Sequence, residues 1–162
     1  MQLPSRLSLL CLLLAPALTV PGRAASLEIV RVFTGWRDAA SFQRVTEYLH
    51  GRENTGGINV LRSRPDERAG YYWQVRLKNG GAALPGVKFE LQVITPAAPE
   101  AKTFTFSADI PAGSRLYQLG VTGADWPGPK ARPVAWHLQV FAADGTTLIA
   151  KESFLWEMPG KH

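Results

Sequence analysis

The dominant pattern along this chain is an alternation of hydrophobic and polar residues. Four segments repeat with a period of two: 71–78, 87–94, 103–108 and 134–141. Such alternation gives a β-strand one face toward a core and one toward water, which is typical of antiparallel sheets. Shorter strand candidates are 27–34, 57–63, 115–121 and 146–156. The pattern predicts an all-β fold, an antiparallel β-sandwich of about eight strands, with a barrel as the less favoured alternative.

The residues between these segments favour turns. Asp144-Gly145 lies between the last two strand candidates, and Asp-Gly supplies the positive φ angles that a tight hairpin requires. Pro96 and Pro99 bracket two alanines and predict a stiff corner. The loop from 79 to 86 contains three glycines and a proline, and it predicts a longer connection. The turn chemistry therefore agrees with a fold of short strands.

One segment departs from the alternation and resembles a helix. Asp38 is a good N-terminal cap, and Gly51 can end the helix. Between them apolar residues recur at helical spacing: Phe42, Val45 and Leu49. We therefore predict one short amphipathic helix from Ala39 to His50, covering a sheet edge or an open end of the sandwich.

The first 25 residues have the pattern of a cleaved signal peptide. A short start containing Arg6 is followed by an apolar run over 7–18 and by a helix break with small residues over 21–25. This run is too short and wrongly flanked to span a membrane. The expected cut follows Ala24 or Ala25 and leaves a single domain, 26–162, without a transmembrane segment. The protein is therefore predicted to be periplasmic or secreted.

Composition narrows the chemistry of the exported part. The one cysteine, Cys11, lies in the leader, so the mature chain has no disulfide, thiol nucleophile or thiolate metal ligand. Without Arg6 and Arg23, 16 basic residues face 13 acidic ones, a net charge of about +3. The signs are interspersed, whereas nucleic-acid binding usually needs a basic stripe. We expect no nucleic-acid partner, no metal and no cofactor.

Basic residues are unevenly distributed by type. From Ser26 to Arg76 all eight are arginine, while lysines outnumber arginines after Leu77. Arginine suits carboxylates and phosphates better than lysine does. The alternative interpretation is that these arginines form salt bridges with the six acids of the same stretch.

The second half of the chain resembles the immunoglobulin-like β-sandwich modules of exported bacterial proteins. The resemblance covers about 70–156 and depends on strand 71–78 with its Asn79-Gly80-Gly81 turn, on the following strand 84–91 and on the Asp144-Gly145 hairpin. It implies a fold and no activity. The cysteine pair of antibody domains is absent, and the predicted helix is not part of that family's plan.

No catalytic signature stands out. A Gly-x-Ser-x-Gly elbow is missing, and the histidines occupy a predicted helix end, an outward strand position and the last residue. A paired-carboxylate site would suit a small hydrolase. Its candidates are Glu53, Asp66 and Glu67, with His50 nearby, but neighbouring arginines explain these acids as salt-bridge partners. We therefore predict that the protein is not an enzyme, with a small hydrolase as an alternative.

Aromatic residues offer one possible binding surface. Trp126 lies in a rigid Pro- and Gly-rich loop, and alternation places Tyr72 and Phe141 on the polar faces of their strands. Exposed rings can stack on sugars or other apolar faces. The alternative is that Trp126 plugs one end of the sandwich and that the helix or a partner sheet covers the other two. The other tryptophans on apolar faces are expected in the core: Trp73, Trp136 and Trp156.

A polar loop is the second binding candidate. It contains Arg52 and Glu53 among glycines, followed by Arg62 and Arg64, which alternation places on one strand face. An acidic sugar or a carboxylate-bearing partner would fit there. An ordinary helix-to-strand connection would use the same residues.

These observations predict an exported, non-catalytic binding or structural module. Its partner would be an envelope protein or a polysaccharide. A carbohydrate-binding module with exposed aromatics is the first alternative. An interaction module should instead have a continuous apolar patch or an unpaired sheet edge.

Overall fold

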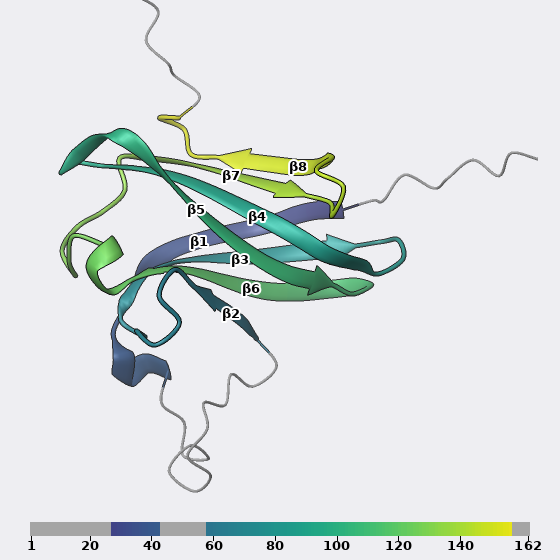
Figure 1. Cartoon of the computed structure of the whole chain (residues 1–162), viewed down its shortest axis with the longest axis horizontal. Coiled ribbons are helices and arrows are strands. Elements are labelled where there is room, and N and C mark those ends of the chain that lie inside the picture. The colour runs from purple at the N-terminus through teal and green to yellow at the C-terminus, as the bar shows by residue number, and fades with distance from the viewer. Residues whose placement is uncertain (1–26, 43–57, 157–162) are drawn as a thin grey trace, which may run out of the picture.

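The computed structural model describes residues 27–42 and 58–156, which form two four-stranded sheets packed face to face (Figure 1). Sheet I has the strand order β1-β3-β6-β2, and sheet II has the order β5-β4-β7-β8. The strands of sheet I are β1 (Leu27–Arg37), β3 (Gly70–Asn79), β6 (Gly113–Thr122) and β2 (Asn59–Arg62). Those of sheet II are β5 (Ala98–Ile110), β4 (Leu84–Thr95), β7 (Ala135–Phe141) and β8 (Thr147–Glu152). The predicted all-β sandwich is confirmed, and each strand candidate contains a strand.

The strand order is that of an immunoglobulin-like sandwich. β1, β3 and β6 occupy the places of strands A, B and E, and β5, β4, β7 and β8 occupy those of C′, C, F and G. The place of strand D is taken by β2, which comes from the A–B connection and runs parallel to β6. The other strand pairs are antiparallel. The expectation of a wholly antiparallel sandwich is therefore wrong at the β2–β6 pair.

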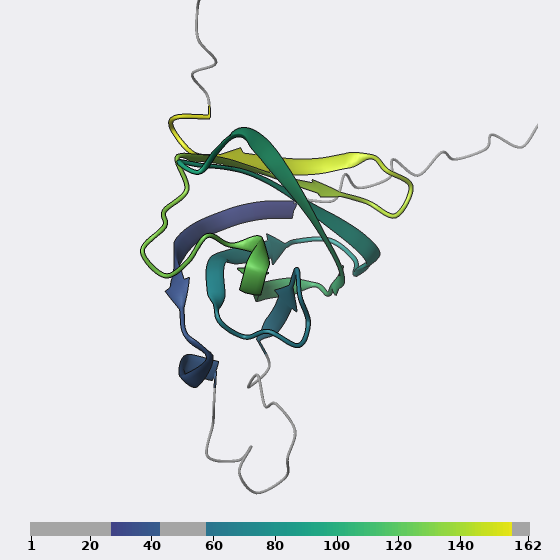
Figure 2. The same ribbon diagram turned by 60° about the vertical axis from the view of Figure 1, so that its left-hand side comes forward.

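Figure 2 shows the two sheets as two layers. The core lies between them, because the period-two alternation points the apolar residues there. Sheet I contributes Trp73, Val75, Leu77, Tyr117, Leu119 and Val121, all fully buried. Sheet II contributes Val87, Phe89, Leu91, Leu138 and Val140, also fully buried. Burying a large apolar side chain stabilises a fold by about 1.5–3 kcal/mol. This core is therefore the main source of stability in a body without disulfides.

Side-chain hydrogen bonds fix the predicted turns. At the end of β3, the Nδ2 of Asn79 donates to the carbonyl of Ala82 at 2.7 Å, and its Oδ1 accepts from the N–H of Gly81 at 2.9 Å. Asn79 is 2% exposed, so this buried amide directs the chain from sheet I to sheet II. In the β7–β8 connection the N–H of Thr146 donates to Asp144 Oδ1 at 2.9 Å. This hydrogen bond lowers the pKa of the Asp144 carboxyl.

The predicted amphipathic helix is not confirmed. The described part, η1 (Ala39–Phe42), is a 3₁₀ turn rather than the start of an α-helix. Residues 43–50 lie outside the described residues. Asp38 does cap this turn, because its Oδ1 accepts from the N–H of Ser41 at 2.8 Å. Within the described ranges, no helix is long and apolar enough to cross a membrane.

Candidate functional site

Trp126 closes one end of the sandwich. It follows the 3₁₀ turn η2 (Gly123–Asp125), whose first residue has a φ of 57° that favours glycine. The indole is 4% exposed and stacks on Tyr71 with ring centroids 4.6 Å apart. It also meets Trp73 edge-on at 6.0 Å. Trp126 is therefore not the exposed ring of a binding surface, and the interpretation that it plugs one end of the sandwich is confirmed.

Tyr72 points away from the core, as alternation predicts, yet it is fully buried. The ring of Phe42 covers it, with centroids 4.8 Å apart. The Tyr72 hydroxyl donates to the carbonyl of Arg68 at 2.6 Å and accepts from Arg62 Nε at 3.0 Å. Its own ring lies over Gly120, where an added Cβ would overlap the Tyr72 Cε1. The predicted exposure of Tyr72 is wrong because the segment after β1 covers this part of the sheet.

The remaining aromatics form no common surface with these two. Phe141 is half-buried on β7, and Lys88 Nζ lies 4.6 Å from its ring centroid. Trp136 is half-buried against the core. Trp156 lies outside the core and stacks on His137 at 5.4 Å, so the prediction that it anchors the core is wrong. A sugar platform built from Trp126, Tyr72 and Phe141 is therefore not formed.

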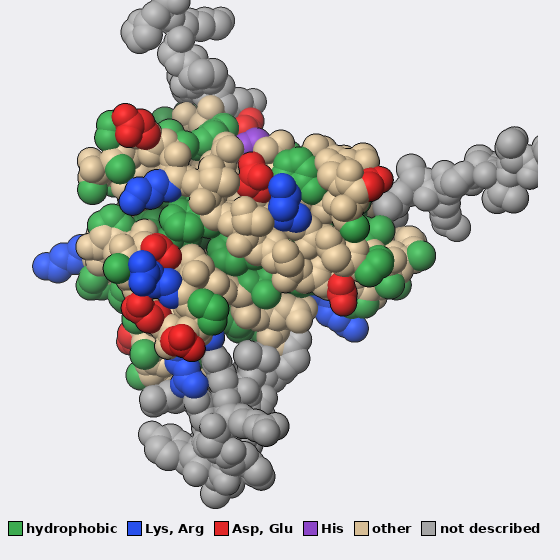
Figure 3. Space-filling view, viewed as in Figure 1, with side chains coloured by type: hydrophobic (Ala, Val, Ile, Leu, Met, Phe, Trp, Pro, Cys, Tyr) green, Lys and Arg blue, Asp and Glu red, His purple; other side chains and the backbone are tan. Residues whose placement is uncertain are grey.

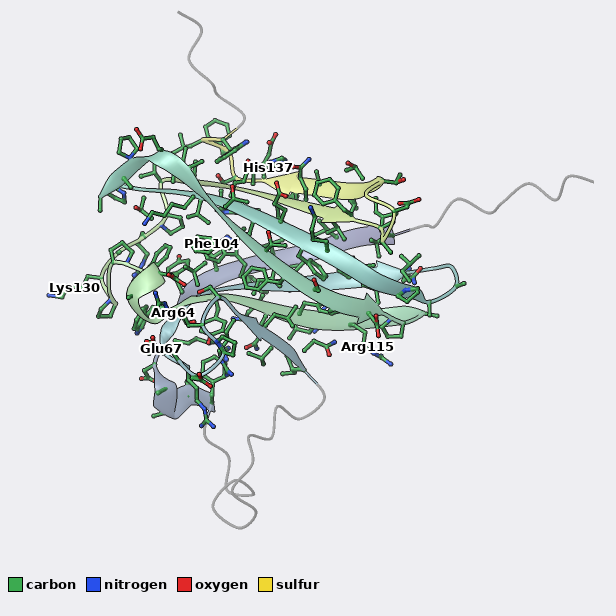
Figure 4. All side chains as sticks on the ribbon, viewed as in Figure 1. Arg64, Glu67, Phe104, Arg115, Lys130 and His137 are labelled. Carbon is green, nitrogen blue, oxygen red and sulfur yellow. The ribbon has the colours of Figure 1, made fainter. Side chains whose placement is uncertain are left out.

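The polar loop is brought together only in part. Arg52 and Glu53 lie outside the described residues. Arg62 ends β2, and its guanidinium lies 5.0 Å from the centroid of Phe42. Arg64 lies beyond β2 and pairs with Asp125 at 3.3 Å and Glu67 at 3.8 Å (Figure 4). The expectation that Arg62 and Arg64 share one strand face is wrong, because the strand ends between them.

The carboxylate candidates do not form a described acid–base pair. Glu67 contacts Arg64. Glu53 and His50 lie outside the described residues, so a site that they would form with Asp66 is not described. His137 Nε2 lies 3.9 Å from Glu152 on sheet II. Within 27–42 and 58–156, no three His, Cys, Asp or Glu side chains are grouped to hold a metal ion.

A groove that sequence reasoning missed lies between β2 and β5, at one side of the sandwich. It has a volume of about 350 Å³. Figure 3 shows hydrophobic side chains gathered along this hollow, beneath β5. Its lining is mostly apolar or hydroxyl-bearing and consists of Val60, Leu61, Arg62, Pro65, Thr105, Phe106 and Ser107. On the opposite side of the sandwich, β1 and β8 contact each other, and at the groove β5 contacts β2 and β6.

The strand beside this groove is an unpaired edge. β5 pairs with β4 on one side, and no other described strand pairs with its second side. It is 13 residues long and carries no charge over 103–108, Thr-Phe-Thr-Phe-Ser-Ala. The other edges are blunted by length, charge or a bulge: β2 has four residues, β8 has six with two charges, and β1 is bulged between Ile29 and Arg31. β5 carries Pro99 and three charged residues toward its ends, Glu100, Lys102 and Asp109, so the part of this edge without such protections is 103–108.

The sequence contained one signal for this feature. The Thr-Phe alternation of 103–108 predicts a strand, but a period of two does not say whether that strand lies in the middle of a sheet or at its edge. That position depends on strand order, which is set by long-range pairing.

Comparisons with known proteins add little to this geometry. No protein-family model matches the chain, and no curated protein matches it. The crystal structure of an immunoglobulin-like protein from Pseudomonas aeruginosa is similar at 16% identity, with a TM-score of 0.36. That match covers 81% of this chain and 97% of the other. The immunoglobulin-like resemblance of this chain therefore rests on its strand order.

Proposed function

We propose that the protein is an exported, non-catalytic binding module that recognises an extended segment of an envelope protein by strand addition to β5. The observation that carries the proposal is the free edge of β5 beside the groove. An edge strand presents a row of unpaired N–H and C=O groups, and an extended backbone is their direct complement. Export itself rests on the leader-like sequence of residues 1–25.

The groove explains how such a segment would be selected. Main-chain hydrogen bonds provide affinity in strand addition, and pockets for alternate side chains provide specificity. Phe106, which is 5% exposed, and the exposed Thr105 line the groove beside the edge. A segment with small or apolar residues at alternate positions fits this lining. The carbohydrate-binding alternative loses support because Trp126 and Tyr72 are buried.

Peptide selection tests the proposal. Random twelve-residue peptides are selected for binding to the protein and to Thr105→Lys, which places a charge on the exposed edge and so opposes strand addition. Ser114→Lys, at an exposed position of β6, is the matched control. Peptides selected on the original protein should bind Ser114→Lys equally and lose at least tenfold in affinity for Thr105→Lys.

Backbone methylation then distinguishes strand addition from other binding. N-methylation of alternate amides in one register of a selected peptide should abolish binding, while the other register should tolerate it, because successive N–H groups of a strand point to opposite sides. Equal sensitivity of both registers, or equal binding to Thr105→Lys, would show that β5 does not bind by strand addition.

A further inference from the structure

The outer face of sheet I carries two arginines directly opposite each other. Arg31 on β1 pairs with Arg76 on β3, and both side chains are exposed. Like charges directly opposite on a sheet destabilise it by repulsion. The folded protein therefore keeps an unfavourable arrangement that a neutral residue at either position would relieve.

Neither arginine has a carboxylate partner within the described residues. Arg76 makes no ion pair or side-chain hydrogen bond there, and the guanidinium of Arg31 contacts the ring of Phe33, 5.1 Å from its centroid. Arg64, by contrast, pairs with two acids. The salt-bridge interpretation of the arginine-rich stretch thus holds for Arg64 and fails for Arg31 and Arg76.

The surroundings add a flat ring and an amide. Phe33 is 57% exposed on the same face of β1, two residues from Arg31. Gln74 lies opposite Phe33, and its position on β3 is two residues from Arg76. Among the described strand residues of this face, the one acid is Glu28, which lies opposite Lys78. The face therefore offers positive charge, an aromatic surface and hydrogen-bonding groups within a few residues.

We infer that this face binds an anionic glycan, with an oxyanion of one sugar held between Arg31 and Arg76 and a sugar ring against Phe33. Arginine forks match planar oxyanions and bind them by charge-assisted hydrogen bonds. A sugar ring has an apolar face for Phe33 and hydroxyl groups for the Gln74 amide. The site is separate from the β5 edge and does not depend on the proposed function.

Other anionic partners fit this face less well. A membrane surface needs a continuous apolar area for insertion, whereas Phe33 lies beside Arg31 and opposite Gln74 on this face. An added peptide strand needs free backbone groups, and those of β3 are paired on both sides by β1 and β6. Nucleic acid needs a longer basic stripe than Arg31, Arg76 and Lys78 provide.

Calorimetric titration with oligogalacturonate tests the inference, because each sugar of this probe carries a carboxylate. Arg31→Gln and Arg76→Gln should each weaken binding about tenfold, the typical effect of losing a charge-assisted hydrogen bond. Lys130→Gln removes the same charge from the distant η2–β7 loop and should change affinity less than about twofold (Figure 4). Phe33→Ala should weaken binding at unchanged charge. Thr105→Lys should leave it unaltered.

The controls separate this site from general charge attraction. The same oligosaccharide with its carboxylates reduced to alcohols should not bind. A sulfated oligosaccharide identifies whether the site accepts any oxyanion, and its binding must show the same dependence on Arg31 and Arg76. Because repulsion is relieved, Arg76→Gln should not lower the melting temperature. The inference is overturned if oligogalacturonate does not bind, if Lys130→Gln weakens it equally, or if only anionic vesicles or an oligonucleotide bind.

Discussion

Replacing Gly120 by alanine tests the packing of Tyr72, which has a glycine on each side. Gly35 and Gly120 both lie directly opposite Tyr72 across the neighbouring strands. A Cβ at Gly120 would meet Tyr72 Cζ at 2.7 Å and overlap Cε1 more closely, whereas a Cβ at Gly35 would meet nothing within 4 Å. Neither glycine has a positive φ. The two substitutions therefore differ in the contact that the new methyl group makes and not in backbone strain.

The magnitude follows from what holds the Tyr72 ring. Overpacking a filled site costs about 1–3 kcal/mol. If the ring shifts, its hydroxyl loses the 2.6 Å hydrogen bond to the Arg68 carbonyl, which adds about 1 kcal/mol. Replacing glycine by alanine also stabilises the fold by about 0.4–1 kcal/mol, because it lowers the conformational entropy of the unfolded chain. We expect Gly120→Ala to lower the free energy of unfolding by about 2 kcal/mol and Gly35→Ala to raise it by up to about 1 kcal/mol.

Urea denaturation followed by tryptophan fluorescence measures both changes, with the slope of the transition as the check on two-state unfolding. The same Gly120→Ala substitution is then made in a Tyr72→Leu background, where the ring that it overlaps is gone. The penalty should fall below about 1 kcal/mol, because residues in contact are not additive. Equal effects at Gly35 and Gly120, or an unchanged penalty in the Tyr72→Leu background, would refute this reasoning.

Three further substitutions have defined expectations. Trp126→Ala should lower the free energy of unfolding by about 3–5 kcal/mol, since it empties the end of the core, and calorimetry of the unfolding transition measures it. Asn79→Ala should lower the free energy of unfolding by about 2 kcal/mol, because the Ala82 carbonyl and the Gly81 N–H both lose their hydrogen bonds to the side chain. Unchanged stability in urea would contradict this. Tyr117→Phe removes a hydroxyl that donates to the Asp109 carbonyl at 2.7 Å, which should cost about 1 kcal/mol at neutral pH. Burial raises the pKa of Tyr117, against the opposing charge of Arg115. The stabilisation by the Tyr117 hydroxyl is therefore complete below about pH 10 and is lost as pH rises through the pKa of the folded state. The free energies of unfolding of the original protein and of Tyr117→Phe, measured in urea, should therefore converge at alkaline pH.

The sequence predicted the strands because alternation records which face of a strand is buried. The alternating residues from Tyr71 to Leu77 face the core as expected. Alternation does not record what covers the outer face of a sheet. It therefore predicts correctly that Tyr72 points away from the core, but it does not reveal that Tyr72 is buried there. Phe42, which covers it, lies 30 positions earlier in the chain. In the described turn the Phe42 ring packs on Tyr72 of the sheet, and the other two residues of the apolar spacing, Val45 and Leu49, lie outside the described residues.

The candidate site was less predictable than the fold. Binding features at β5 and at the Arg31–Arg76 pair arise from neighbours in the sheet rather than neighbours in the chain. Arg31 and Arg76 are 45 positions apart, and nothing in the local sequence of either places them opposite each other. Thr105 becomes an edge residue only because, among the described strands, none pairs with β5 on its second side.

β2 occupies the place of strand D although it comes from the A–B connection, and this has a consequence for the order of folding. The β4–β5 and β7–β8 hairpins join neighbouring segments and need little loop closure, whereas Arg62 meets Gly120 from 58 positions away and in parallel. Pairing between such distant segments has a larger loop-closure entropy cost than a hairpin, and this cost precedes the stabilising contacts. β6 is the one described strand that pairs with β2, so the groove wall that β2 forms can be completed only once β6 is in place. Until then, the nascent sandwich exposes β6 as a second free edge.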